Sequence, residues 1–469
     1  MLADGKEPMS TTSKRITLPV LGEASRQRAP RSNKQKKVNI VSLGCPKNQV
    51  DSEVILGNLK HTRIVDKAEE ADTIVINTCG FIESAKQESI QTILEAIELK
   101  KRAAKKGITK EIIVAGCLSE RYPKELAAEM PEVDAFFGVH QFDKITERIE
   151  GHYQQVLFTE RILLNQRHYA YLKISEGCNQ RCGFCYIPMI RGNLDSKSIA
   201  DNVAEAEKLA SLGVKELICV SQDTSSYGYD FDRSAPNLRQ NKHLIELLHA
   251  LGEVRGIEWI RVMYLYPSLF SDTLIETIAT HPKICKYIDM PVQHISDRIL
   301  KTMRRNTGKK QTTDLLYKIK ARMPDVALRT SMIVGYPGET EADFEELCDF
   351  VREFKFDRLG VFIYSQEEGT YAYDLEPQVE EAVKKERFNR LMEIQREISH
   401  AHNMEKIDQT FRVMIDTQSS EHYIGRTMSD APEIDNEVII TSSRKLKPGQ
   451  FVDVKITDAT EYDLYAEAL

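Results

Sequence analysis

From residue 38 onward, short apolar runs alternate with stretches in which apolar residues recur at helical spacing. Runs rich in β-branched residues occupy 38–44, 73–78 and 112–116, and residues 84–102 repeat their apolar positions with the period of a helix. This alternation is typical of a parallel sheet covered by helices. A cysteine follows each run directly, at Cys45, Cys79 and Cys117. Because ligands of an open α/β sheet bind at the carboxyl ends of its strands, the sequence predicts that these three thiols converge.

Three thiolates at one sheet edge are suited to an iron–sulfur cluster or another metal site. Any one of these cysteines alone could equally be a small buried apolar residue, but the same strand-end position occurs three times. Three further cysteines stand singly within strand-like or helical runs and are predicted to pack in the core: Cys219, Cys285 and Cys348.

The middle of the chain carries a second and denser cysteine pattern. Cys178, Cys182 and Cys185 form a C-x3-C-x2-C motif. Three thiolates at this spacing can bind three irons of a 4Fe-4S cube and leave the fourth iron open to an exogenous ligand. A structural zinc site would need a fourth Cys or His, and residues 186–191 supply none. The motif therefore favours an iron–sulfur cluster.

The region around this motif predicts a partial parallel barrel. One strand leads into Cys178, and further apolar runs follow, with helical stretches between most of them, at 216–220, 260–265, 287–290, 328–334 and 359–364. Six strand-and-helix units are typical of such a barrel, whose chemistry lies at the carboxyl ends of its strands. Polar or glycine-rich loops at those ends are candidate ligand contacts, although each alone could be an ordinary solvated turn.

The last segment, 404–469, predicts a small β-barrel, because its apolar runs at 411–415, 438–441 and 451–456 are short and separated by turns. The segment carries seven basic and thirteen acidic residues. An RNA-binding barrel should present a basic face to phosphates, whereas an acidic barrel suits a basic protein partner. The alternative is a solvated acidic surface without a role.

The composition limits the number of domains and the class of protein that the sequence can encode. The 469 residues are 41% hydrophobic and 29% charged, with a net charge of -7, as expected for a globular protein of two to four domains that does not bind polyanions over its whole surface. Nine cysteines without a signal peptide indicate metal or redox chemistry in a reducing cytoplasm, and no apolar run is long enough for a membrane span. Residues 1–37, with nine basic and three acidic residues, predict a disordered arm, and an organellar transit peptide is the alternative.

Several motifs make the chain resemble the methylthiotransferase family of radical S-adenosylmethionine (SAM) enzymes. They are Gly44-Cys45-Pro46-Lys47-Asn48, Asp51-Ser52-Glu53, Asn77-Thr78-Cys79-Gly80-Phe81, Gly116-Cys117 and the Cys178–Cys185 motif. The resemblance implies an α/β fold class: a flavodoxin-like N-terminal domain, a partial (βα)6 radical SAM barrel and a small antiparallel β-barrel called TRAM. The expected boundaries are a disordered extension at 1–35, the N-terminal domain at 36–154, the radical SAM core at 164–402 and TRAM at 404–469.

The resemblance also implies the cofactors, which are SAM and two 4Fe-4S clusters. An auxiliary cluster on Cys45, Cys79 and Cys117 would hold the sulfur to be transferred, and the cluster on Cys178, Cys182 and Cys185 would bind SAM. No catalytic residue is expected beyond these ligands. The expected SAM contacts are Gln222, Asp223, Gln293, Arg329, Gly335 and Gly338.

Two branches of the family differ in substrate, since one modifies an aspartate of small-subunit ribosomal protein S-twelve and the other an adenosine of tRNA. Segments such as 138–142, 264–267 and 422–427 resemble the first branch. The tRNA branch typically has Asn in place of Asp223 and an Arg a few residues after the second cysteine. In this chain the corresponding residues 80–84 are Gly-Phe-Ile-Glu-Ser, without an Arg. A more distant alternative is an iron–sulfur electron carrier or sensor without turnover.

The first branch implies a cytoplasmic transferase of sulfur-containing groups that converts the aspartate to 3-methylthioaspartate by β-methylthiolation. One SAM would methylate the sulfur, and a second would supply the radical that removes hydrogen from the β-carbon. The reaction needs an electron donor and a sulfur donor. The basic substrate protein is expected to dock on the acidic TRAM domain, and nucleic acid and membranes are not expected partners.

Overall fold

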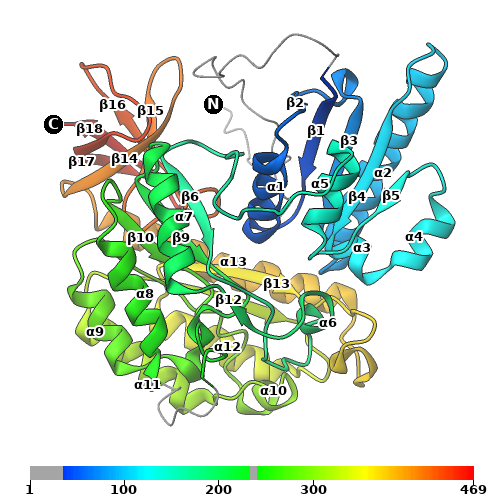
Figure 1. Cartoon of the computed structure of the whole chain (residues 1–469). Helices are drawn as coiled ribbons and strands as arrows, with labels where there is room; N and C mark the ends of the chain where they lie inside the picture. The colour runs from blue at the N-terminus through cyan, green and yellow to red at the C-terminus, as the bar shows by residue number, and fades with distance from the viewer. Residues whose placement is uncertain (1–34, 233–239) are drawn as a thin grey trace, which may run out of the picture. The chain divides into compact units, whose positions relative to one another are not determined.

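The computed structural model describes residues 35–232 and 240–469, so almost all of the predicted N-terminal extension lies outside the described residues (Figure 1). The chain divides into two compact units. The first comprises the residues up to Asn165 together with Met189–Arg191, and the second comprises Gln166–Pro188 with Gly192–Leu469. Within the described ranges, no helix is both long and apolar enough to cross a membrane.

The first unit is built on a parallel five-stranded sheet with the strand order β2-β1-β3-β4-β5. This order is the flavodoxin-like one, as the resemblance implied. The strands are β1 (Lys37–Ser42), β2 (Arg63–Ile64), β3 (Thr73–Thr78), β4 (Glu111–Gly116) and β5 (Ala135–Phe136). The helices are α1 (Pro46–Asn58), α2 (Glu83–Ala104), α3 (Cys117–Arg121), α4 (Pro123–Glu129) and α5 (Phe142–Glu150).

Helices cover both faces of this sheet (Figure 1). Because successive strand residues point to opposite faces, Ile74 and Ile76 pack with Ile93 of α2, whereas Val75 packs with Ile55 of α1 on the other face. A sheet buried on both faces needs continuous apolar strands, which is the pattern that the sequence shows.

The second unit contains a parallel six-stranded sheet with the order β13-β12-β11-β10-β9-β6, which confirms the predicted partial barrel. Its strands are β6 (Tyr169–Lys173), β9 (Glu216–Val220), β10 (Trp259–Val262), β11 (Ile284–Asp289), β12 (Ala327–Val334) and β13 (Arg358–Ile363). Its main helices are α7 (Ile199–Ser211), α8 (Lys242–Gly252), α9 (Asp272–Thr280), α10 (Asp297–Thr302), α11 (Lys309–Arg322), α12 (Glu341–Phe354) and α13 (Glu381–Met404). Two short strands, β7 (Ser175–Glu176) and β8 (Asp195–Ser196), pair beside the cysteine motif, and α6 (Ile187–Arg191) follows that motif.

For β10, the predicted strand extends further than the observed one. The run 260–265 was expected to be extended throughout, but β10 ends at Val262. Tyr264 adopts a positive φ of 61° and donates its backbone N–H to the Asp289 carboxylate at 3.0 Å. The apolar residues that follow Val262 therefore belong to a buried loop at the carboxyl end of the strand.

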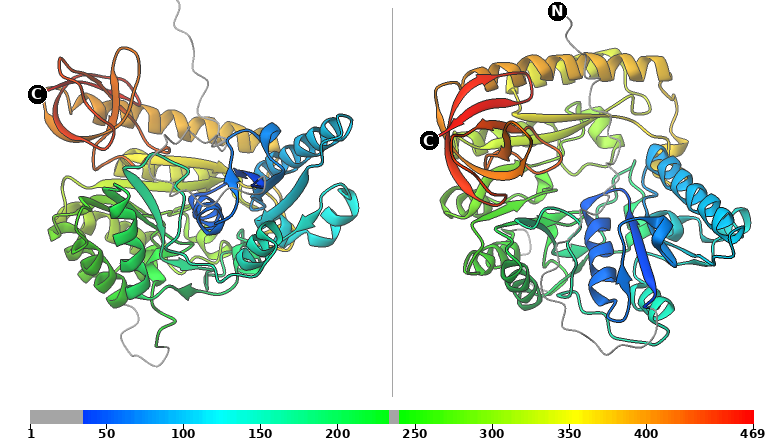
Figure 2. Two further views of the ribbon diagram at one scale, coloured as in Figure 1. Left: turned by 45° about the horizontal axis from the view of Figure 1, so that its top comes forward. Right: turned by 90° about the horizontal axis from the view of Figure 1, so that it is seen from above.

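The C-terminal segment forms the predicted small β-barrel, which is closed in the order β14-β15-β16-β18-β17. It was expected to be antiparallel, but one neighbouring pair, β16 and β18, runs parallel. Its strands are β14 (Thr410–Gln418), β15 (Tyr423–Arg426), β16 (Val438–Thr441), β17 (Phe451–Ala459) and β18 (Leu464–Ala468). Inward-facing aliphatic residues such as Val413, Val438 and Val454 fill its core. Figure 2 shows the barrel, coloured orange to red, at one end of the long helix α13, where Asn403 donates to the Thr460 carbonyl at 3.1 Å.

The C-terminal barrel is joined to the six-stranded sheet by buried ion pairs, which we call the barrel junction. Arg426 donates to Glu216 at 2.8 Å and to Asp416 at 2.7 Å, and Arg358 donates to Asp430 at 2.6 Å. Glu216 and Arg358 are the first residues of their strands. The barrel junction therefore lies at the amino ends of the parallel strands, opposite the edge where the candidate ligand loops emerge.

The electrostatics of the barrel junction favour the charged state of its acids. Burial alone would raise the pKa of Asp416, but Arg426 and His168 hold that pKa below its ordinary value. Burial would likewise raise the pKa of Asp430, and the charges of Arg358 and Lys406 lower it overall. Both carboxylates are therefore ionised at neutral pH in the folded protein.

Candidate metal centres

The first unit brings its three strand-end cysteines together, as predicted. Cys45 follows the end of β1 and precedes α1, Cys79 directly follows β3, and Cys117 begins α3 after β4. Gly44 has a φ of +84°, and a Cβ at this position would lie 2.7 Å from the Cβ of Cys79. A glycine is therefore required where the chain after β1 approaches Cys79.

Asn48 of α1 fixes the two strand ends beside these cysteines. Its side-chain amide donates to the carbonyl of Leu43 at 3.0 Å and to the carbonyl of Thr78 at 2.9 Å. Cys79 itself is tied to α2, because its backbone N–H donates to the Ser89 hydroxyl at 3.0 Å. The cysteine backbones are thus held by side chains that are themselves buried.

The proximity of the three thiols also has an electrostatic consequence. Burial, together with the charges of Cys45 and Cys117, raises the pKa of Cys79 to about 12, while Arg191 opposes this rise. Burial likewise raises the pKa of Cys117, and Arg191 opposes this rise. Three such thiols become thiolates together only when a cationic group compensates their charges, which fits a metal cluster as the occupant.

The C-x3-C-x2-C motif forms a second cysteine cluster in the second unit. Cys178 follows β7 and donates its backbone N–H to the Gly192 carbonyl at 3.1 Å, and Cys185 donates its backbone N–H to the Cys182 carbonyl at 3.1 Å. Burial raises the pKa of Cys178 and of Cys185 to about 12, and in each case the charge of Cys182 contributes to the rise. The three thiols are therefore neighbours here as well.

Two residues outside the predicted ligand set contact this motif. Arg305 donates to the Sγ of Cys182 at 3.5 Å and stacks 4.0 Å from the ring centre of Tyr266. The Tyr266 hydroxyl lies 3.9 Å from the same sulfur. The resemblance already included the segment containing Tyr266, but nothing in the local pattern indicated Arg305.

Polar atoms beside the motif are buried without hydrogen-bond partners among the described residues. They are two acceptors, Oε1 of Gln222 and Oδ1 of Asp223, and one donor, Nε of Arg305. The other oxygen of Asp223 accepts from Gln180 at 3.0 Å, and burial raises the pKa of Asp223. Buried polar groups are normally paired, so these atoms leave hydrogen-bonding capacity for a ligand with both donors and acceptors, such as SAM.

Further predicted SAM contacts lie at the ends of β11 and β12. Gln293 has a positive φ of 76°, and its backbone pairs with Ser331 and Ile333 in the manner of a strand. Gly335 and Gly338 also have positive φ values, 72° and 77°. The loop 335–338, which we call the glycine loop, therefore needs its two glycines for its backbone conformation. Its role in SAM binding stays a prediction.

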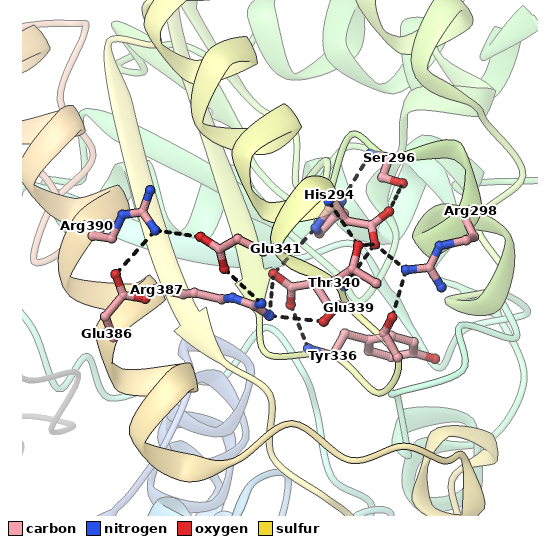
Figure 3. A network of polar contacts seen from close by, with 12 residues as sticks. His294, Ser296, Arg298, Tyr336, Glu339, Thr340, Glu341, Glu386, Arg387 and Arg390 are labelled. Atoms are coloured by element: carbon pink, nitrogen blue, oxygen red, sulfur yellow. Dashed lines mark hydrogen bonds and ion pairs between the residues drawn. The ribbon is translucent and has the colours of Figure 1, made fainter.

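A buried polar network supports this glycine loop (Figure 3). Glu339 is fully buried at its carboxylate, accepts the backbone N–H of Tyr336 at 2.9 Å and lies 3.5 Å from Arg387 of α13. Thr340 caps α12 in a capping box with Asp343, and Asp343 accepts the Ser296 hydroxyl at 2.6 Å. These contacts hold the loop rigidly at the carboxyl end of β12.

Arg329 is placed differently from the other predicted SAM contacts. Its guanidinium donates to Asp289 at 2.7 Å and lies 3.6 Å from Asp435 of the C-terminal barrel. Both partners are buried carboxylates, so the charge of Arg329 is already compensated. Its assignment as a SAM contact stays a prediction that this geometry does not favour.

The remaining cysteines are in the core, as predicted. Cys219 of β9, Cys285 of β11 and Cys348 of α12 are fully buried. Burial raises the pKa of the first two to about 12 and that of Cys348 to about 11. Thiols of this kind stay protonated and unreactive.

Comparison with known proteins first defines the class. Residues 37–138 match the uncharacterized protein family UPF0004, residues 172–351 match the Radical SAM superfamily, and residues 407–469 match the TRAM domain. Together with the six-stranded sheet and the C-x3-C-x2-C motif, these matches define a radical SAM protein with an N-terminal α/β domain and a C-terminal TRAM barrel.

Full-length relatives narrow this class to a family. The chain is 47% identical over 443 residues to the ribosomal protein uS12 methylthiotransferase RimO of Flavobacterium johnsoniae. The matched region covers 93% of this chain and 99% of that protein. Proteins of the same name from Acetivibrio thermocellus and Clostridium tetani are each 46% identical, covering 93% and 91% of this chain and 99% and 97% of the relatives. The chain belongs to this methylthiotransferase family, as the sequence motifs predicted.

Solved structures support the fold alone. The radical SAM methyltransferase TsrM from Kitasatospora setae, with cobalamin and a 4Fe-4S cluster bound, matches with a TM-score of 0.50 at 13% identity, over 72% of this chain and 77% of that chain. The cobalamin-dependent SAM radical enzyme OxsB with aqua-cobalamin bound also has a TM-score of 0.50 at 13% identity, over 77% of this chain and 56% of that chain.

Proposed function

We propose that this protein methylthiolates the β-carbon of an aspartate in ribosomal protein uS12, the S-twelve protein of the small subunit, using SAM and two 4Fe-4S clusters. The observation that carries the proposal is the presence of two separate sets of three neighbouring thiols in a member of the uS12 methylthiotransferase family. A protein that only cleaved SAM would need one such set. We also propose the domain boundaries 36–154, 164–402 and 404–469 for the three functional parts.

In the first unit, Cys45, Cys79 and Cys117 would hold the auxiliary cluster. The chain contributes buried surroundings and fixed cysteine backbones, since Asn48 ties the ends of β1 and β3. Three protein ligands leave an iron available for an exogenous sulfur. We propose the cytoplasm as the site of the reaction, because all these thiols must stay reduced.

In the second unit, Cys178, Cys182 and Cys185 would hold the cluster that binds SAM. When bound and reduced, this cluster and SAM supply the radical that can attack an unactivated C–H bond. The protein orients the ligand: Gln222 and Asp223 offer buried acceptors, and Arg305 offers a buried donor. The remaining candidate contacts are Gln293, Arg329, Gly335 and Gly338.

The TRAM barrel is proposed as the docking surface for the basic uS12 protein. Some of its acidic residues, notably Asp416 and Asp430, are already paired with arginines at the barrel junction. Nine acids are nevertheless exposed: Glu405, Asp408, Glu421, Glu433, Glu437, Asp453, Asp458, Glu461 and Glu467. Five bases are exposed with them: Arg412, Arg444, Lys445, Lys447 and Lys455. The exposed surface therefore keeps an acidic surplus, which favours a basic protein over a polyanion.

The test is a comparison of reconstituted wild-type protein with a variant in which Cys45, Cys79 and Cys117 are all changed to Ala. The wild type should contain about eight irons, and the variant about four, because each cube holds four. Under reduction with SAM, the variant should still release 5'-deoxyadenosine but should no longer modify uS12, as measured by mass spectrometry. An unchanged iron content in the variant would refute the auxiliary cluster.

The same materials separate the other candidate functions. A tRNA methylthiotransferase would leave uS12 unmodified and would add a methylthio group to adenosine in tRNA, which nucleoside analysis detects. An electron carrier or sensor would release no 5'-deoxyadenosine. A sulfur donor and an electron donor must be supplied in each assay, because the reaction consumes both.

A further inference from the structure

Arg191 follows both sets of cysteines in the sequence, six residues after Cys185, but it groups with the first unit. There its guanidinium donates to the Sγ of Cys117 at 3.4 Å. The side chain is only 2% exposed. A cluster-binding cysteine is thus contacted by a buried cation from the chain segment that carries the other cluster's ligands.

The guanidinium is oriented by two further residues. Asp51 of α1 accepts from it at 3.0 Å, and Asn48 accepts through its side-chain oxygen. Asn48 is fixed in turn, because its amide group donates to the ends of β1 and β3. The N–H group that points at the sulfur therefore has little freedom to rotate away.

Asp51 also decides how this contact acts. Because its carboxylate balances the charge of Arg191, the pair adds little net charge near Cys117, and the directed N–H group provides the main interaction. Hydrogen bonds to cysteine sulfurs withdraw electron density from a cluster and tune its reduction potential. Such a donor stabilises the reduced, more negatively charged cluster.

We propose that Arg191 is a positioning residue that acts through Cys117 and raises the reduction potential of the auxiliary cluster. This inference rests on the proposed function, since it requires a cluster on Cys45, Cys79 and Cys117. Arg305 makes an equivalent contact with Cys182 at 3.5 Å in the second unit. In each cysteine set, an arginine therefore donates to a ligand sulfur.

The experiment measures the auxiliary cluster alone. In full-length protein with Cys178, Cys182 and Cys185 changed to Ala, the reconstituted cluster is titrated with reductant and followed by electron paramagnetic resonance. Because removing Arg191 alone would leave the Asp51 carboxylate buried without this guanidinium, the main variant is Arg191→Met with Asp51→Asn, and Arg191→Lys is the conservative variant.

The matched control is Arg161→Met with Glu53→Gln. This pair also lies in the first unit, with side-chain exposures of 1% and 0%, but its guanidinium donates to a glutamate carboxylate instead of a cysteine sulfur. Its loss should disturb packing to a similar degree. Any difference in potential between the two double variants therefore reports the hydrogen bond to sulfur.

We expect the ratio of reduced to oxidised cluster at a fixed potential to fall about tenfold in the Arg191 variant, which equals about 59 mV for one electron. The control pair should not change it, and Arg191→Lys should give an intermediate value. Equal potentials in the Arg191 and control variants would overturn the inference while leaving the proposed function intact. Absence of any cluster in the background protein would instead refute the auxiliary site itself.

Discussion

Changing Asp430 to Asn tests whether the barrel junction is a major source of stability. Asp430 is 3% exposed and accepts from Arg358 and from the Thr427 hydroxyl, each at 2.6 Å. The substitution keeps the shape of the side chain but removes its charge. Arg358 would then remain buried without its ionic partner.

Removing one member of a buried ion pair typically costs about 3 to 5 kcal/mol, because the other charge stays desolvated and uncompensated. For a unit of this size, 1 kcal/mol corresponds to roughly 2 °C in the midpoint of thermal unfolding. The expected decrease in the apparent midpoint for Asp430→Asn is therefore roughly 6 to 10 °C.

The assay is thermal unfolding of the full chain at neutral pH, followed by circular dichroism. Glu461→Gln is the matched control, because Glu461 is an exposed acid of the same barrel and its loss should change the midpoint by only about 1 °C. The double variant Arg358→Met, Asp430→Asn should recover part of the loss, since no charge is then left unpaired. A midpoint for Asp430→Asn within the range of the control would refute the assigned role of the pair.

Two further predictions use the same protein. Gly44→Ala should reduce the iron content from about eight to about four per chain, because the added Cβ would collide with Cys79. The control is Gly107→Ala, which has a similar φ of +73° but lies in open space and should retain all the iron. Equal losses of iron in both variants would show that backbone strain alone is responsible. Asp416 has a lowered pKa in the folded state, so its ion pair with Arg426 should stabilise the protein fully above the unfolded pKa of about 3.9 and lose that effect as the pH falls further. The difference in unfolding midpoint between wild type and Asp416→Asn should therefore be larger at pH 7 than near pH 3, and a difference that grew on acidification would contradict this sign.

The sheet architecture could be predicted from the sequence because it depends on local patterns. Strands β3 and β9 have the predicted bounds, since runs of buried β-branched residues end where polar residues or cysteines begin. The convergence of Cys45, Cys79 and Cys117 followed from one general rule about strand ends in parallel sheets. The TRAM strands β15 and β18 were not predicted, because Tyr-Ile-Gly-Arg and Leu-Tyr-Ala-Glu-Ala are not runs of β-branched residues, unlike the equally short β16.

The polar contacts could not be predicted in this way. Arg426 and Glu216 are 210 residues apart, and nothing near either residue indicates its partner. Arg191 looks like an ordinary surface arginine after a cysteine motif, and only the folded chain places it beside Cys117. Such pairs depend on the register between distant elements, which a short sequence window does not contain.

The barrel junction limits how this protein can be recombined with its relatives. A chimera that exchanged only residues 404–469 would keep the pairs with Glu216 and Arg358 only if the incoming barrel supplied equivalents of Arg426 and Asp430. The TRAM barrel is therefore not electrostatically self-contained at its own boundary. An exchange of the barrel should therefore include the amino ends of β9 and β13, which carry Glu216 and Arg358.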